Sequence, residues 1–266
     1  MLVHTSHPGN IGAAARALKT MGFDAPGSLV LVEPRFADAL THPEAQAFAS
    51  GALDVLGSAR IVSSVAQALQ GCQFTAALSA RLREFSPPVC DPRMLAQQLA
   101  QSFAPAQKAA QEEGAQAQDW QAAILFGSER YGLPNEVVLD CNVLVNIPAN
   151  PAYSSLNLAQ AVQLLAWELR MAALEQPATT GPASPLAMRP LPGFSGVPAA
   201  HEQVEGMYAH LEQALLALGF LKENNPKKLM PRIKRMFGRS GLEVEEVNIL
   251  RGIAGYILQR CRPPQK

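Results

Sequence analysis

Short apolar runs alternate with helical segments along the first two-thirds of the chain, and this alternation restricts the fold more than any other feature. The runs have the length of strands and are rich in β-branched residues, whereas the segments between them carry apolar residues at helical spacing. Strands that are apolar throughout are buried on both faces, which is typical of a parallel sheet covered by helices. The expected strands are residues 28–33, 60–62, 73–79, 122–127 and 143–148, and the expected helices lie near 11–21, 43–51, 64–70, 92–103 and 155–174. The opening LVH is short for a core strand, so minimal pairing is expected there, and the polar segment 104–119 is expected to be an exposed excursion.

A proline-rich segment divides the chain. Residues 176–198 contain six prolines and three glycines without a periodic apolar pattern. Proline interrupts both helices and sheet ladders, so this segment is predicted to be a linker. It separates a body, residues 1–175, from a tail, residues 199–266.

The tail is predicted to be a small all-α domain of about three helices, too small to be stable without the body or another chain. Two of its segments place apolar residues on one stripe at helical spacing. The stripes are Val204, Met207, Tyr208, Leu211, Leu215 and Leu218 in the first segment, and Val247, Leu250, Ile253, Ile257 and Leu258 in the last.

The net charge of zero hides an asymmetry between these two parts. Residues 1–198 hold 11 basic and 15 acidic residues (−4), and residues 199–266 hold 11 basic and 7 acidic residues (+4). A basic tail on an acidic body suggests a polyanionic partner, although charge alone leaves chance as an equal explanation. Aromatic residues make up only 6% of the chain. A base-stacking surface built on aromatic side chains is therefore not expected.

Other classes of protein are disfavoured by what the chain lacks. No apolar run is long enough to span a membrane, and the first residues have no secretory signal pattern, so a cytoplasmic protein is expected. The four cysteines are far apart, which makes a disulfide framework unlikely, and the five histidines never approach a ligand spacing. No metal is predicted.

Three loops at strand ends carry the chemistry. In the first, residues 7–22, two glycines permit a tight turn before a helix, and Asn10 and Arg16 can project into a site. In the second, residues 124–136, glycines flank the pair Glu129–Arg130. In the third, residues 145–171, an irregular loop precedes a long helix that Ser154 or Ser155 can cap. Each loop alone also fits an ordinary surface turn with solvated charges.

A nicotinamide-dependent oxidoreductase is one alternative for such a chain. The first loop has the spacing G-x-x-G rather than the G-x-G-x-x-G of a dinucleotide site, and only Glu33 lies near the end of the next strand. The dinucleotide hypothesis is therefore weak.

Taken together and in order, the three loops resemble a known family. N-x-G-x-x-x-R, F-G-S-E-R-x-G-L and I-P-A-N-P-x-Y-S-S-L-N are similar to the three signature motifs of the SPOUT-class (SpoU-type) RNA 2′-O-methyltransferases. The tail resembles the C-terminal extension of the members that act on cytidine or uridine at position 32 of the tRNA anticodon loop.

The resemblance implies a parallel α/β domain whose C-terminal part forms a trefoil knot, an exception to the rule against knots. It also implies a homodimer that binds S-adenosylmethionine, with the tRNA anticodon stem-loop as the partner. Small residues that expose backbone amides and carbonyls suit an adenine edge. Carried over by motif, the cofactor-binding residues are Leu78, Ser79, Ala80, Gly127, Ile147, Ser154, Ser155 and Leu156.

Arg16 matches the family's catalytic arginine. Because a guanidinium keeps its proton far above neutral pH, we expect Arg16 to clamp a phosphate and stabilise the developing alkoxide rather than to remove the 2′-OH proton. Asn10, Glu129 and Asn157 are expected to be supporting polar groups of the catalytic site.

The tail adds an independent argument for RNA. Residues 222–239 hold seven basic residues and a single acidic one, and their spacing places several cations on one helix face, with Leu229, Ile233, Met236 and Phe237 opposite. The predicted RNA-binding residues are Arg16, Lys228, Arg232, Lys234, Arg235 and Arg239. Pro231 is expected to start this helix. The alternative to an enzyme is a catalytically idle RNA-binding protein on the same fold, which would not need the full set of catalytic residues.

Overall fold

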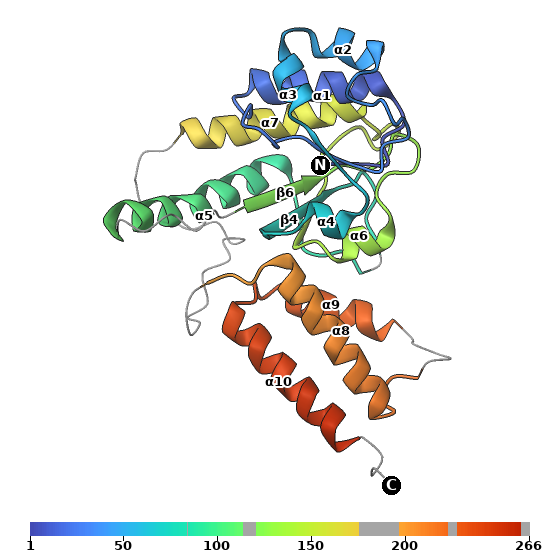
Figure 1. The fold of residues 1–266 in the computed structure, drawn as a ribbon, viewed down its shortest axis with the longest axis vertical. Coiled ribbons are helices and arrows are strands. Elements are labelled where there is room, and N and C mark those ends of the chain that lie inside the picture. Colours follow the sequence, from blue (N-terminus) through green and yellow to red (C-terminus); the bar gives the residue numbers. More distant parts are fainter. Residues whose placement is uncertain (84, 114–120, 176–196, 223–227, 262–266) are drawn as a thin grey trace.

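The computed structural model describes residues 1–83, 85–113, 121–175, 197–222 and 228–261 (Figure 1). Within them the body is an α/β domain and the tail is entirely helical, as predicted. The strands are β1 (Leu2–Val3), β2 (Val30–Val32), β3 (Arg60–Val62), β4 (Cys72–Leu78), β5 (Val89–Cys90), β6 (Gln121–Leu125) and β7 (Val143–Val145).

All these strands are parallel and form one continuous layer. One part has the order β1-β2-β3 and the other the order β5-β7-β4-β6. A parallel bridge between Leu2 and Phe126 joins the two parts, with the Val3 amide donating to the Phe126 carbonyl at 2.8 Å. The opening strand is therefore only two residues long. It nevertheless lies within the sheet and is hydrogen-bonded on both sides, so two residues are enough to hold it in place.

Alternate residues of the central strands contribute to two separate cores, as the period-two geometry of a strand requires, whereas β3 at the edge is largely exposed. Leu2 and Leu31 pack in the core on one face, and Val3, Val30 and Val32 pack in the core on the other. Helices α1, α5 and α7 cover the first face, and the short helices α4 and α6 cover the second (Figure 1). Both faces are thus covered, as the uniformly apolar strands predict.

The helices of the body agree with the predicted segments except in two places. The segment predicted as one helix at 43–51 is interrupted at Ser50, whose φ of 52° breaks the helical turn, and a further helix follows. The helix that begins at Pro92 extends to Glu113, so its predicted end near residue 103 is wrong and the first part of the segment 104–119 is helical. The body helices are α1 (Pro8–Thr20), α2 (Pro43–Ala49), η1 (Ser50–Ala52), α3 (Leu53–Gly57), α4 (Val65–Ala68), α5 (Pro92–Glu113), α6 (Asn135–Leu139) and α7 (Leu158–Leu174).

The tail comprises α8 (His201–Ala217), α9 (Leu229–Gly238) and α10 (Val244–Arg260). Met207, Tyr208 and Val247 form its small core. Leu218 and Ile253, predicted for the buried stripes, are about half exposed, so their assignment to the core is wrong. Three short helices leave some apolar positions facing outward because the bundle has no further layer to cover them.

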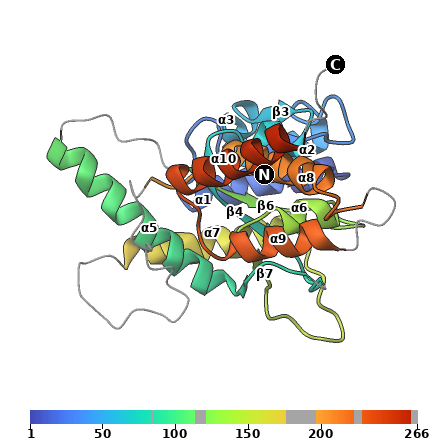
Figure 2. The same cartoon turned by 90° about the horizontal axis from the view of Figure 1, so that it is seen from below.

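The tail lies on the side of the body that carries α4 and α6, and α9 runs next to α6 (Figures 1 and 2). The predicted linker lies outside the described residues except for its last two, of which Pro198 pairs with Glu243 of the tail. In the described part of the chain, every helix is too short or too polar to cross a membrane.

Candidate active site

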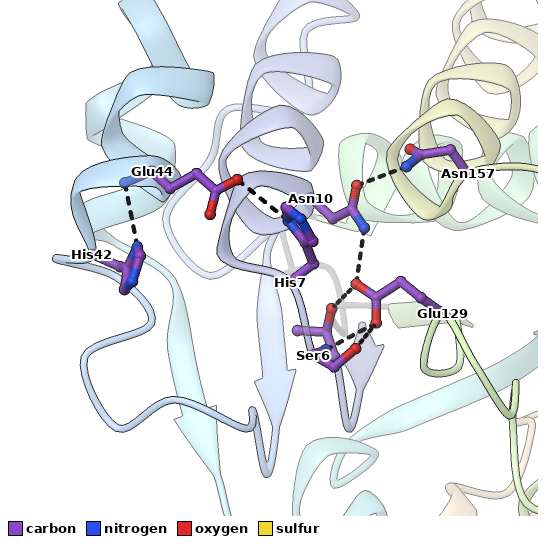
Figure 3. A network of polar contacts seen from close by, with 8 residues as sticks. Ser6, His7, Asn10, His42, Glu44, Glu129 and Asn157 are labelled. Carbon is purple, nitrogen blue, oxygen red and sulfur yellow. Dashed lines mark hydrogen bonds and ion pairs between the residues drawn. The ribbon is translucent and has the colours of Figure 1, made fainter.

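Glu129 joins two of the three predicted loops. It follows β6, and its carboxylate accepts hydrogen bonds from the segment between β1 and α1 (Figure 3). The Thr5 hydroxyl and the Asn10 amide each donate to Oε1 at 2.9 Å. The Ser6 amide and hydroxyl donate to Oε2 at 2.9 and 2.8 Å. Four donors on one carboxylate fix the start of α1 against the end of β6.

The third loop is tied to the same network through Asn157. Its Nδ2 donates to Oδ1 of Asn10 at 2.9 Å, while its own Oδ1 accepts from the amides of Ala159 and Gln160 (Figure 3). Asn157 is therefore the N-cap of α7, and the expectation that Ser154 or Ser155 caps this helix is wrong. The structure thus brings Asn10, Glu129 and Asn157 together.

Glu129 stays ionised in this setting. Its partial burial alone would raise the pKa, but the hydrogen bonds from Asn10 and Ser6 outweigh burial and lower the pKa from 4.5 to about 2. A carboxylate with so low a pKa is a weak base. Its chemistry is that of a fixed negative charge that holds the loops in place.

A cavity of about 210 Å³ opens beside Glu129, at the carboxyl ends of β4, β6 and β7. Ligands of open α/β sheets bind at this edge. All the residues predicted to bind the cofactor line the cavity, namely Leu78, Ser79, Ala80, Gly127, Ile147, Ser154, Ser155 and Leu156. The lining combines apolar side chains such as Leu78, Ile147 and Leu156 with serines and charged groups, the mixed composition of a ligand site.

Gly127 is required by the tight packing of the second loop. A Cβ at this position would lie 2.0 Å from the carbonyl carbon of Gly132 and 2.1 Å from the amide nitrogen of Leu133. The loop folds back on itself here, with the Gly132 amide donating to the Ser128 carbonyl at 2.8 Å. Any side chain at Gly127 would push this wall of the cavity outward.

Several residues at the rim of the cavity were missed by the sequence analysis. Arg81, Arg83 and Tyr131 line it, and the Tyr131 side chain is 76% exposed, with the Arg130 guanidinium 5.3 Å from its ring centroid. Arg81 and Arg83 follow β4 directly, and this position at the end of a strand was the available signal. An exposed aromatic ring at the rim also shows that a low aromatic content does not exclude a local stacking surface.

Arg16 lies apart from this cavity. It is exposed in the C-terminal half of α1, the helix whose first turn contains Asn10, and it is not among the described residues that line the cavity. The structure of one chain therefore brings together the residues predicted to bind the cofactor and the polar network but leaves the predicted catalytic arginine outside.

The basic residues of the tail separate into two groups. Lys228, Arg232, Arg235 and Arg239 are exposed along α9 and its two ends. Lys234, also predicted to contact RNA, is 21% exposed, and its ammonium is bonded to carboxylates of the body and the tail. Lys234 is therefore removed from the predicted RNA-facing set.

The basic helix itself differs from its prediction at two points. It begins at Leu229 rather than at Pro231, because a proline in the first turn has no helical hydrogen bond to lose. Met236, placed on the buried side by spacing, is about half exposed.

Two protein-family models match the chain, one over the body and one over the tail. The model of the SpoU rRNA Methylase family matches residues 1–167, and that of the tRNA methyltransferase TrmJ, C-terminal domain, matches residues 202–266. Two curated relatives carry the name tRNA (cytidine/uridine-2′-O-)-methyltransferase TrmJ. The protein of Salmonella typhimurium is 41% identical over 98% of this chain and 96% of its own length, and that of Escherichia coli is 42% identical over 98% and 94%.

Solved structures similar to this chain are also methyltransferases. The crystal structure of TrmJ from Z. mobilis ZM4 is 30% identical, covers 97% of both chains and superposes with a TM-score of 0.72. A probable methyltransferase from Bordetella pertussis is 47% identical and covers 65% of this chain and 93% of its own, with a TM-score of 0.53. With the second and third motifs lining one cavity, the first bonded to them through Asn10, and a matching tail, the chain belongs to the SpoU methylase family and, within it, to the TrmJ group of methyltransferases.

Proposed function

We propose that the chain transfers a methyl group from S-adenosylmethionine to a ribose 2′-hydroxyl of tRNA, at cytidine or uridine 32 of the anticodon loop. The observation that carries this proposal is the cavity at the sheet edge, lined by the motif residues and bordered by the ionised Glu129 network. The names of the curated relatives support the tRNA ribose as the substrate.

The residues around the cavity fit S-adenosylmethionine. Leu78, Ile147 and Leu156 offer apolar surface for the adenine, and the glycine and serine positions offer backbone donors and acceptors. Glu129 places a negative charge at the edge, which favours a cationic sulfonium, and Arg81 can hold the carboxylate of the methionyl part. When bound, the cofactor supplies a methyl group that a ribose 2′-oxygen can attack in line.

The polar network has a positioning role in this proposal. Because the four hydrogen bonds to Glu129 come from the segment that leads into α1 and from Asn10 in its first turn, the network sets the direction of the helix that carries Arg16. Arg16 clamps the phosphate next to the target ribose and stabilises the developing negative charge on the 2′-oxygen.

The position of Arg16 supports a homodimer with composite active sites. Arg16 is exposed on α1 and does not line the cavity of its own chain. Two-fold symmetric dimers place a surface of one chain against the equivalent surface of the other. In the proposed dimer, Arg16 of one protomer completes the cavity of its partner.

The chain path near the cavity supports the trefoil knot expected for the family. The last helix of the body, α7, follows β7 and the third loop, and it packs against both α1 and α5. In the sheet order β5-β7-β4, β7 lies between β4 and β5, and in the proposed topology the chain that leaves β7 passes through the connection between those two strands.

The tail supplies the second contact with RNA. Lys228, Arg232, Arg235 and Arg239 are exposed cations along one helix, and binding to the tRNA backbone through them makes the affinity fall as salt rises. At the rim, Tyr131 can stack on a base that the anticodon loop leaves unpaired.

Replacement of Arg16 tests the proposed catalytic role. Arg16→Ala is expected to lower kcat for methyl transfer to tRNA by roughly a hundredfold or more, because one fixed donor to a developing oxyanion has about that effect. Arg16→Lys is expected to lower kcat as well, because lysine cannot form the bidentate contact. Binding of S-adenosylhomocysteine, measured by calorimetry, should stay unchanged in both variants.

Two outcomes would contradict the assignment. Near-normal turnover by Arg16→Lys would exclude a bidentate clamp. Wild-type protein that binds tRNA tightly without any methyl transfer would favour an idle RNA-binding protein on this fold.

A further inference from the structure

Lys234 holds the tail against the body. It lies on α9, and its ammonium contacts Asp140 of the body at 2.5 Å and Glu205 of α8 at 3.3 Å. The ring of Tyr208 lies beneath it, with the ammonium 5.3 Å from the ring centroid. One side chain of the tail thus joins a carboxylate of the body, a carboxylate of the neighbouring tail helix and an aromatic ring in the tail core.

The burial of this cluster distinguishes it from a surface ion pair. The side chains of Lys234, Asp140 and Glu205 are exposed by only 21%, 27% and 35%. Desolvation alone would lower the pKa of Lys234, but the two carboxylates outweigh desolvation and raise it. The ammonium therefore stays charged, and removal of Lys234 would leave two partly buried carboxylates without their counterion.

Helix α6 connects this cluster to the active-site cavity. Asp140 is the C-cap of α6, whereas Asn135, the first residue of the same helix, accepts a hydrogen bond from the Arg83 guanidinium at 2.7 Å. Arg83 lines the cavity, and α6 itself directly follows the second loop. A single short helix is therefore bonded to the cavity rim at one end and to the tail at the other.

Phe85 makes a second connection between the same two places. It belongs to the segment after β4 that carries Arg81 and Arg83. The Lys228 ammonium lies 5.1 Å from its ring centroid, and the Arg232 guanidinium lies 5.7 Å from it. Two of the exposed cations of α9 are thereby held beside the rim of the cavity, each by a cation–π contact.

We propose that Lys234 docks the tail onto the body of its own chain and so holds the cationic face of α9 beside the active-site cavity, where a single RNA contacts both. Lys234 is a positioning residue, because it acts on RNA through the placement of Lys228 and Arg232. This inference rests on the proposed function for the identity of the RNA. Because the tail is already docked when RNA binds, the binding free energy is not reduced by the entropy lost in ordering the tail.

The test uses the full-length protein and three variants of the docking cluster. Lys234→Met removes the ammonium and keeps the length of the side chain, Asp140→Lys reverses the partner, and the double variant Asp140→Lys/Lys234→Asp restores opposite charges. Lys19→Met is the matched control, because Lys19 pairs with Asp54 at 2.7 Å on an exposed face of the body.

The expected result is a separation of kinetic constants with rescue by the swapped pair. Lys234→Met and Asp140→Lys should raise the KM for tRNA and the Kd for tRNA by about tenfold, within the range of coupled sites, while kcat at saturating tRNA changes little. The radius of gyration of the free protein, measured by X-ray scattering, should increase. The double variant should recover most of the affinity and the compact shape.

Three results would overturn the inference. One is a Lys234→Met protein that matches Lys19→Met in both tRNA affinity and radius of gyration. Another is a double variant no better than its single parents, and the third is a loss confined to kcat. If the wild type transfers no methyl group, the proposed function fails, but scattering and tRNA binding still decide whether the cluster docks the tail.

Discussion

Glu129 illustrates how a carboxylate at the edge of a reaction site can be kept out of acid–base chemistry. The hydrogen bonds that it accepts from Asn10 and Ser6 outweigh its partial burial and lower its pKa to about 2, so it neither donates nor accepts a proton near neutral pH. The sequence places these residues more than a hundred positions apart, and only the sheet brings them together. Glu129 therefore contributes to the site by holding other residues in position and not by reacting itself.

Glu129→Gln is expected to destabilise the fold in a pH-dependent way. The folded pKa lies below the ordinary value of 4.5, so ionised Glu129 stabilises the fold fully above about pH 4.5 and loses this effect as the pH falls toward 2. At pH 7 the variant should lose about 1–3 kcal/mol of unfolding free energy, the usual cost of removing a charged hydrogen-bond acceptor. Urea unfolding from pH 7 down to pH 3 measures this, and the gap between the two proteins should narrow on acidification. A difference in unfolding free energy that did not change with pH would contradict the stabilising role of the ionised Glu129 network.

At the scale of elements, the function depends on how the second loop returns on itself between β6 and α6. Gly127 permits this return because a Cβ would lie 2.0 Å from the backbone of Gly132. The same turn leads into α6, which carries the contact to the tail. One loop therefore shapes the cavity wall and sets the helix on which the tail docks.

Gly127→Ala is expected to weaken binding of S-adenosylhomocysteine by at least about tenfold, because the added methyl group forces the cavity wall to move. Gly57→Ala is the matched control, since a Cβ there meets nothing within 4 Å. Calorimetry on both variants gives the comparison. Equal affinity in the two variants would show that the second loop does not bound the cofactor site.

The sequence predicted these elements unevenly, for physical reasons. Uniformly apolar strands such as β4 and β7 were found because burial on both faces leaves a clear composition. β5 was missed because two residues carry no period. Helical spacing found α9 but placed Met236 on the buried side, because spacing alone does not show which neighbours a face meets. Lys234 was included among the RNA-binding residues as part of the basic run, and nothing in the sequence showed its carboxylate partners. Motif resemblance found the cavity lining, whereas Tyr131 and Arg83 at the rim carried no motif of their own.

At the scale of the whole molecule, one chain holds a cavity without Arg16 and a tail docked on the opposite face of the sheet from α1 (Figure 1). A second copy is needed to bring the arginine to the cavity in the proposed dimer. The tail, in contrast, reaches its own body through Lys234 and Phe85. The arginine that completes a cavity and the tail that lies beside that cavity are thus expected to come from different chains.

Mixing two impaired variants, assayed at S-adenosylmethionine too dilute to saturate Gly127→Ala, tests this division. Arg16→Ala keeps its cavity and Gly127→Ala keeps its arginine, so a mixed dimer should contain one complete site. After exchange of subunits, activity should return to about a quarter of the wild-type value, because half of the dimers are mixed and each has one of two sites. Methyl transfer by the mixture, compared with each variant alone, is the measurement. A mixture as inactive as its components would mean that Arg16 acts on its own cavity.

The most direct test of the central claim is to locate the methyl group in the product. Unmodified tRNA transcript is incubated with the protein and labelled S-adenosylmethionine, and the modified nucleotide is identified by nuclease digestion and mass spectrometry. The account predicts a single 2′-O-methyl group on the ribose at position 32 of the anticodon loop, absent when Arg16→Ala replaces the wild type. A methyl group on a base, or on a ribose outside the anticodon loop, would contradict it.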